Sequence, residues 1–192
     1  MLASTVVLSL AAVVVSVPPA EPPKREWLLH LAPGFVLAPY IVEPYGPPAG
    51  PSLRIGAHAV RWGGRHRRFF LGGGPTLESG FFFFRSEAAN QTSIVGDLLL
   101  GGGRRGEWAA YSQMSLGAGV YVNRALDHLT AFPGLRFAVG AGGFRKVTDK
   151  VSVGGLLSAG YIGLPFGGVG GGIDLNASVV VNFHFGRRGD PL

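Results

Sequence analysis

The chain has no cysteine, few charged residues and, after its first 20 residues, no long hydrophobic run. Without cysteine, a disulfide framework, a thiolate nucleophile and a cysteine-ligated zinc site are excluded. Charged residues make up 15% of the chain, below the roughly 25% of ordinary soluble domains. No apolar stretch after residue 20 approaches the roughly 18 residues that a membrane helix needs. The chain is therefore apolar overall without a spanning helix beyond its N-terminus.

Glycine is abundant instead, at 32 of 192 positions, and it follows no three-residue period, which excludes a collagen helix. Each glycine inside a helix costs about 0.8–1 kcal/mol relative to alanine, so long helices are not expected. Strands tolerate glycine where a barrel bends or where backbones approach closely. The composition favours an all-β fold, and the length suits one domain.

The N-terminal segment differs from the rest of the chain. Residues 1–17 carry no charge and are typical of the apolar core of a signal peptide, with a retained N-terminal anchor as the alternative. Proline recurs in the residues that follow, which indicates an extended leader. We therefore divide the chain into a signal peptide or anchor (1–20), a Pro-rich leader (21–25) and a β-barrel domain with a short basic C-terminal tail (26–192).

Alternation of apolar and polar residues is the main evidence for strands. In Leu175–Phe185 the odd positions are apolar, and four of the five even positions are polar. A helical period of 3.6 would mix these two sets. Similar alternation, or a weaker form of it, predicts seven more strands, at 27–40, 53–59, 69–84, 94–101, 108–122, 135–141 and 151–161.

Eight strands with largely alternating long and short connections resemble the small outer-membrane barrels of the OmpA and OmpX type. The connections expected to be long are 43–48 and 85–92, with a medium one at 124–130. The resemblance implies a closed antiparallel up-and-down barrel in a bacterial outer membrane, with the periplasm or secretion as the alternative. It also implies that the aromatic-ended strand Val179–Phe185 contacts the outer-membrane assembly machinery. A basic tail, residues 186–192, follows that strand and departs from the pattern.

Strand parity assigns side chains to the two faces of such a barrel. Charged and amide side chains on the polar faces should form a network in the lumen, because isolated buried charges are too costly. The expected lumen residues are Arg54, His58, Glu78, Asp97, Gln113, Arg136, Asn176 and Asn182. The expected lipid-facing residues are Leu116, Val120, Leu135, Phe137, Val139, Val179, Val181 and Phe183. A barrel of about eight strands is just wide enough for its side chains to fill, so we expect a plugged lumen.

The remaining candidates for a metal-binding or catalytic role are histidines. His30, His58 and His184 could converge in the lumen, where we expect hydrogen bonding, with a metal-binding or proton-linked role as the alternative. No HExxH or related motif is present, and we expect no cofactor. Asp127–His128 is the only candidate for a catalytic pair, and no nucleophile accompanies it. The sequence therefore does not predict an enzyme.

The chain is basic, with a formal net charge of +6. Most of its lysines and arginines fall in the connections expected to be short and at the termini, so contact with anionic lipid headgroups is one interpretation, and ordinary polar turns are the other. The glycine- and arginine-rich turn Gly102–Gly106 is too short to indicate nucleic-acid binding. We expect a structural or loop-display membrane protein. Three alternatives remain open: a narrow solute channel, a soluble lipocalin-like barrel that binds an apolar ligand, and a lipid-modifying enzyme.

Overall fold

The computed structural model describes residues 25–38, 48–63, 68–83, 88–125, 128–163 and 172–185. The predicted signal segment, the leader up to residue 24 and the tail 186–192 lie outside these residues. No helix in the described part of the chain is long and apolar enough to cross a membrane.

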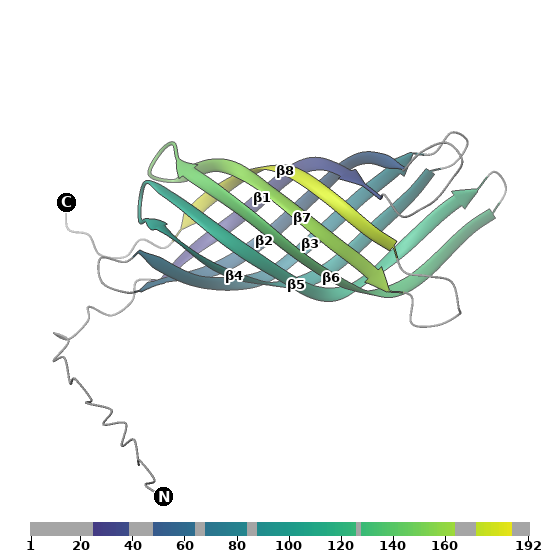
Figure 1. The fold of residues 1–192 in the computed structure, drawn as a ribbon, viewed down its shortest axis with the longest axis horizontal. Helices are drawn as coiled ribbons and strands as arrows, with labels where there is room; N and C mark the ends of the chain where they lie inside the picture. The colour runs from purple at the N-terminus through teal and green to yellow at the C-terminus, as the bar shows by residue number, and fades with distance from the viewer. Residues whose placement is uncertain are drawn as a thin grey trace, which may run out of the picture.

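Eight antiparallel strands close into one barrel, in sequence order, as predicted. Each strand is hydrogen-bonded to the strands before and after it, and β1 closes the ring with β8. Figure 1 shows an elongated barrel of strongly tilted strands. The strands are β1 (Arg25–Leu37), β2 (Ala49–Gly63), β3 (Phe69–Phe83), β4 (Ala88–Arg104), β5 (Trp108–Ala125), β6 (His128–Lys146), β7 (Val151–Gly163) and β8 (Gly172–Phe185).

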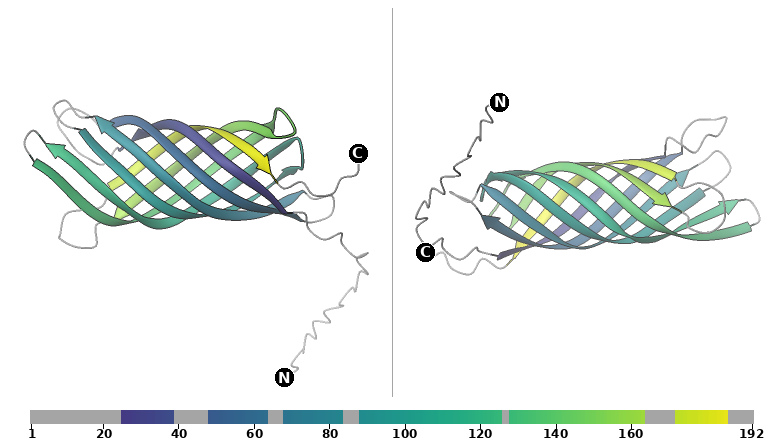
Figure 2. Two further views of the ribbon diagram at one scale, coloured as in Figure 1. Left: turned by 180° about the vertical axis from the view of Figure 1, so that it is seen from behind. Right: turned by 60° about the horizontal axis from the view of Figure 1, so that its bottom comes forward.

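The two ends of the barrel differ in their connections. Trp27 pairs with Phe185, so the start of β1 and the end of β8 lie together at what we call the termini end. The connections β2–β3, β4–β5 and β6–β7 share that end, and the other four lie at the opposite end, which we call the loop end. Strands β5 and β6 extend farthest at the loop end (Figure 2).

Two predicted connections were wrong. β4 begins at Ala88, so the connection expected over residues 85–92 spans only residues 84–87. β5 ends at Ala125 and β6 begins at His128, so the connection expected over residues 124–130 spans only residues 126 and 127. Backbone ladder bonds continue through Asn90, Gln91 and Thr92, where apolar alternation has already faded. Strand pairing therefore extends beyond the segment that hydrophobicity identifies.

Candidate functional site: a charged network inside the barrel

The structure places all eight predicted lumen residues on the inner face of the barrel. Seven are buried and the eighth, Asn176, is half-buried. The buried seven are Arg54, His58, Glu78, Asp97, Gln113, Arg136 and Asn182. They come from β2 to β6 and β8, so the tilt and closure of the sheet bring together side chains far apart in sequence.

Asp97 in β4 is the centre of the first part of the network. Its Oδ2 accepts from Thr76 Oγ1 at 2.6 Å and from His58 Nε2 at 3.0 Å. Its Oδ1 accepts from Ser115 Oγ at 2.6 Å and lies 3.3 Å from Arg54 Nη2. Four donors from three other strands, β2, β3 and β5, therefore stabilise one buried carboxylate.

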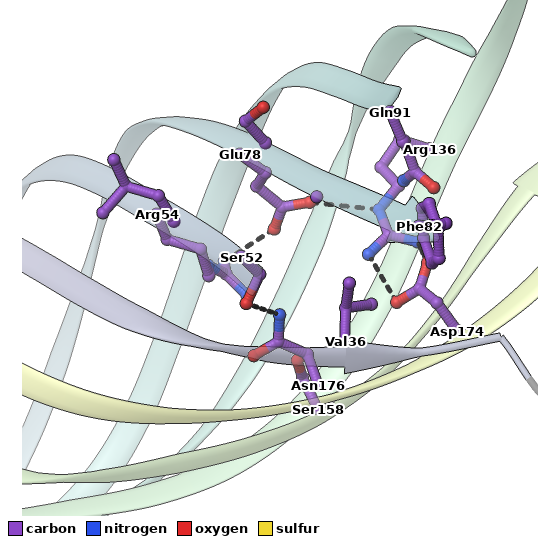
Figure 3. Close-up of a pocket in the computed structure, with 13 residues that line it drawn as sticks. Val36, Ser52, Arg54, Glu78, Phe82, Gln91, Arg136, Ser158, Asp174 and Asn176 are labelled. Atoms are coloured by element: carbon purple, nitrogen blue, oxygen red, sulfur yellow. Dashed lines mark hydrogen bonds and ion pairs between the residues drawn. The ribbon is translucent and has the colours of Figure 1, made fainter. Parts of the chain in front are cut away.

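Glu78 in β3 joins this part of the network to a second part. Its Oε1 lies 2.9 Å from Arg54 Nη2 and its Oε2 lies 3.0 Å from Arg136 Nε. Arg136 in turn binds Asp174 in a bidentate manner, through Nη1 at 2.5 Å and Nη2 at 3.0 Å. Figure 3 shows Arg136 held between the two carboxylates, with Arg54 on the other side of Glu78.

The predicted amides lie in smaller hydrogen-bonded groups beside this network. Asn176 Nδ2 donates to Ser52 Oγ at 2.6 Å, and Gln113 Nε2 donates to Ser115 Oγ at 3.3 Å. Asn182 Nδ2 donates to Ser152 Oγ at 3.3 Å, and its Oδ1 lies 3.0 Å from His30 Nδ1.

The three histidines do not all converge. The ring centres of His30 and His58 lie 5.4 Å apart in the lumen. His184 lies nearer the termini end, where its Nδ1 is 2.6 Å from Glu26 Oε1 and its Nε2 is 2.9 Å from Ser152 Oγ.

Two buried carboxylates were missed by the sequence analysis. Each lies one residue before a strand predicted from alternation, Asp174 before Leu175–Phe185 and Glu26 before the strand at 27–40. The signal was present, since Asp174 has the same parity as Asn176 and Asn182 on β8, and Glu26 has the same parity as His30 on β1. The catalytic candidate Asp127 lies outside the described residues, and the side chain of His128 is not described.

The lumen also holds two apolar clusters, one on each side of the charged network. Toward the termini end lies an apolar cluster that includes Leu28, Trp62, Phe70 and Tyr111. At the loop end lies a second one, formed by Val36, Ala38, Phe82 and Ala89, with Tyr121 packed against it. The charged network therefore lies between two apolar layers, where low polarity strengthens its ion pairs.

The predicted lipid-facing residues all point outward. Six are exposed, and Val181 and Phe183 are half-buried. The exposed six are Leu116, Val120, Leu135, Phe137, Val139 and Val179. Together with other exposed apolar side chains such as Ile94 and Leu157, they make the outside of the barrel apolar.

Comparisons with known proteins agree with this architecture. No family model and no curated protein sequence matches the chain. Solved structures do match. The crystal structure of Neisserial surface protein A (NspA) superposes with a TM-score of 0.64 at 15% identity, over 86% of this chain and 100% of NspA. The fold is that of the small outer-membrane barrels.

Two further structures share this outer-membrane barrel fold. Ail, the attachment invasion locus protein of Yersinia pestis, solved with the heparin analogue sucrose octasulfate, has a TM-score of 0.52 at 10% identity, over 84% of this chain and 99% of Ail. The N-terminal β-barrel domain of Pseudomonas aeruginosa OprF has a TM-score of 0.50 at 16% identity, over 85% of this chain and 100% of that domain. At these identities the likeness extends to the fold alone.

Proposed function

We propose that this chain is an integral protein of a bacterial outer membrane, with a closed lumen and a structural or loop-display role. The observation that carries the proposal is the inside-out distribution of side chains. Ion pairs such as Arg136–Asp174 are buried inside the barrel, whereas Leu116 and Leu135 are more than 60% exposed on its outer face. Hydrocarbon favours this arrangement, because a membrane barrel needs an apolar outer band.

The same observation argues against the lipocalin-like alternative. A barrel that binds an apolar ligand needs an apolar cavity of a few hundred cubic ångströms or more. In this barrel the lumen instead holds Arg54, Glu78, Asp97 and Arg136. In a soluble protein the outer face of the barrel would contact water. Large apolar side chains lie on that face, where Phe69, Ile94 and Leu157 are each 68% exposed.

Packing of the lumen supports a plug rather than a solute channel. Three cavities along the lumen measure about 20, 20 and 10 Å³. Each holds about one water molecule, far less than an organic solute needs. Figure 3 shows the charged side chains of the first of these cavities reaching across the lumen toward one another.

A display role is supported by the loop end. The longer connections, residues 38–48 and 164–171, lie there together with the extended β5–β6 hairpin. No catalytic role is proposed, because the central acids and bases are paired with one another.

Two partners belong to this proposal. Anionic headgroups would meet the basic termini end, where Arg68, Arg104, Arg145 and Lys150 are exposed. The assembly machinery would meet β8, which closes the ring with β1. If the first contact exists, refolding into vesicles with anionic lipid should be faster than into zwitterionic vesicles, and glutamine at Arg104 and Arg145 should reduce the difference.

Fractionation with a carbonate wash, combined with gel mobility before and after boiling, tests the membrane assignment. We expect the protein to remain with the membrane and to migrate differently when unboiled, because a closed barrel stays folded in the gel. Release by carbonate with mobility unaffected by boiling would support the soluble alternative. In planar bilayers, we expect no stable conductance, and regular open-channel steps would support the channel.

A further inference from the structure

Three buried polar atoms that lack a hydrogen-bond partner belong to residues lining one small cavity. They are Nε2 of His30, Nδ1 of His58 and the hydroxyl of Tyr111, whose residues are 4%, 1% and 7% exposed. The cavity measures about 10 Å³, and apolar side chains, among them Phe70 and Leu99, complete its wall. A buried polar atom left unpaired costs about 1–3 kcal/mol, so these atoms call for an occupant.

In each imidazole, the hydrogen bond made by one nitrogen determines whether the other nitrogen, which has no partner, carries a proton or a lone pair. His58 Nε2 lies 3.0 Å from a carboxylate oxygen of Asp97, which only accepts, so Nε2 carries the proton. His30 Nδ1 lies 3.0 Å from the amide oxygen of Asn182, so Nδ1 carries the proton there. In the neutral rings, the free nitrogens therefore present lone pairs, and they cannot satisfy each other.

The charge of the surrounding network favours a cation over a neutral occupant. Among the described central residues, three carboxylates (Glu78, Asp97 and Asp174) face only two guanidiniums (Arg54 and Arg136). This excess attracts a cation, which can bind both lone pairs, although a divalent ion exceeds the excess by one charge.

We propose that His30, His58 and Tyr111 form an internal binding site for one divalent transition-metal ion of the zinc class. Imidazole nitrogen is a preferred ligand of such ions, with Zn–N bonds of about 2.0–2.1 Å. Two imidazoles on one tetrahedral ion then have ring centres on the order of 5 Å apart. The observed separation of 5.4 Å agrees with that estimate.

The surroundings of the two rings resemble those of metal-binding histidines. Such histidines donate their other N–H to a carboxylate or amide oxygen that orients the ring, as Asp97 and Asn182 do here. The described residues contain no metal-binding group of three or more His, Cys, Asp or Glu side chains. The site therefore depends on two imidazoles and the Tyr111 oxygen, which predicts moderate affinity.

The test is zinc content after refolding of the full chain in detergent with Zn²⁺ and dialysis against a weak chelator. We expect one bound ion per chain and a higher midpoint for the thermal loss of the fast-migrating folded band. His30→Gln and His58→Gln should each retain one ion fewer than the wild-type chain and lose the thermal shift. Tyr111→Phe should weaken binding without abolishing it.

His184→Gln is the matched control, because both ring nitrogens of His184 already have partners. It should retain the ion. If replacing His58 prevents folding because Asp97 loses a donor, His30→Gln decides the question. A wild-type chain that retains no zinc, or a His30→Gln variant with unchanged zinc content and thermal shift, would overturn the proposal and leave the cavity to a water molecule. Because the readouts are metal content and thermal midpoint, failure here leaves the membrane assignment untouched.

Discussion

At the residue scale, one side chain in the lumen can form hydrogen bonds or ion pairs with several others. Arg136 donates to Glu78 and to both oxygens of Asp174, and it is 4% exposed. Removing Arg136 alone is costly, because Asp174 then keeps its buried charge without its guanidinium partner. Replacing a whole buried ion-pair network by an apolar core changes the free energy of unfolding little, whereas removing one member lowers it strongly.

We therefore expect Arg136→Ala to lower the free energy of unfolding by about 3–5 kcal/mol, because buried Asp174 loses its guanidinium partner and buried Glu78 loses one of its two. Urea titration in detergent micelles, followed by the mobility of the unboiled protein, measures the change. Arg145→Ala, in an exposed position near the end of β6, is the control and should stay within about 0.5 kcal/mol of wild type. Equal stability of the two variants would contradict the interpretation of the network as an interdependent unit.

At the element scale, the glycines of β7 have two different surroundings. A Cβ placed on Gly154 would lie 1.8 Å from the carbonyl oxygen of Gly143 and 2.6 Å from Phe144 Cα, both in β6. A Cβ placed on Gly155 would come no closer than 3.7 Å to its nearest neighbour, Ser178 O. Close approach of two backbones, rather than a turn, explains the glycine at position 154.

Gly154→Ala should therefore destabilise the barrel by about 1–3 kcal/mol, the usual cost of overpacking. Gly155→Ala should be nearly neutral. The folded fraction after refolding into lipid vesicles and the urea midpoint together measure both variants. If Gly155→Ala proves as costly as Gly154→Ala, strand propensity rather than close contact governs these positions.

The outer face of β8 gives a second prediction at this scale. Val179 is 56% exposed and lies near the middle of the strand. Arginine there would place a charge in hydrocarbon, so Val179→Arg should cost about 2–4 kcal/mol of stability in a bilayer. Val179→Leu is the control and should have little effect. Normal insertion of Val179→Arg together with failed insertion of Arg54→Ala would reverse the assignment of inside and outside.

At the scale of the whole molecule, ring closure leaves no sheet edge. β8 is hydrogen-bonded to both β7 and β1, so its loss would expose two rows of unpaired backbone groups. In a bilayer such groups cost several kcal/mol each, which makes an open sheet untenable.

Deletion of residues 172–192 should therefore abolish insertion and the heat-modifiable band, whereas deletion of residues 186–192 alone should preserve both, because the described strands end at Phe185. Membrane fractionation of the two truncated chains provides the comparison. An inserted, heat-modifiable product without β8 would mean that seven strands can close by themselves.

Local alternation of apolar and polar residues was sufficient to predict most of the barrel from the sequence. It predicted eight strands and the side of the sheet on which Arg54, Glu78, Asp97 and Arg136 lie, because a residue's parity decides its face wherever one face is apolar. It was insufficient at strand ends, where hydrogen bonding through Asn90 and Thr92 continues without an apolar pattern.

Parity alone could not say which face points inward, because a soluble barrel would show the same alternation. Closure of the ring decided that, and the tilt of the strands decided which inner residues meet. Arg136 and Asp174 lie 38 residues apart on strands that do not pair, as do Arg54 and Asp97 at 43 residues. Such contacts across a lumen depend on the diameter and stagger of the closed sheet, which no local pattern encodes.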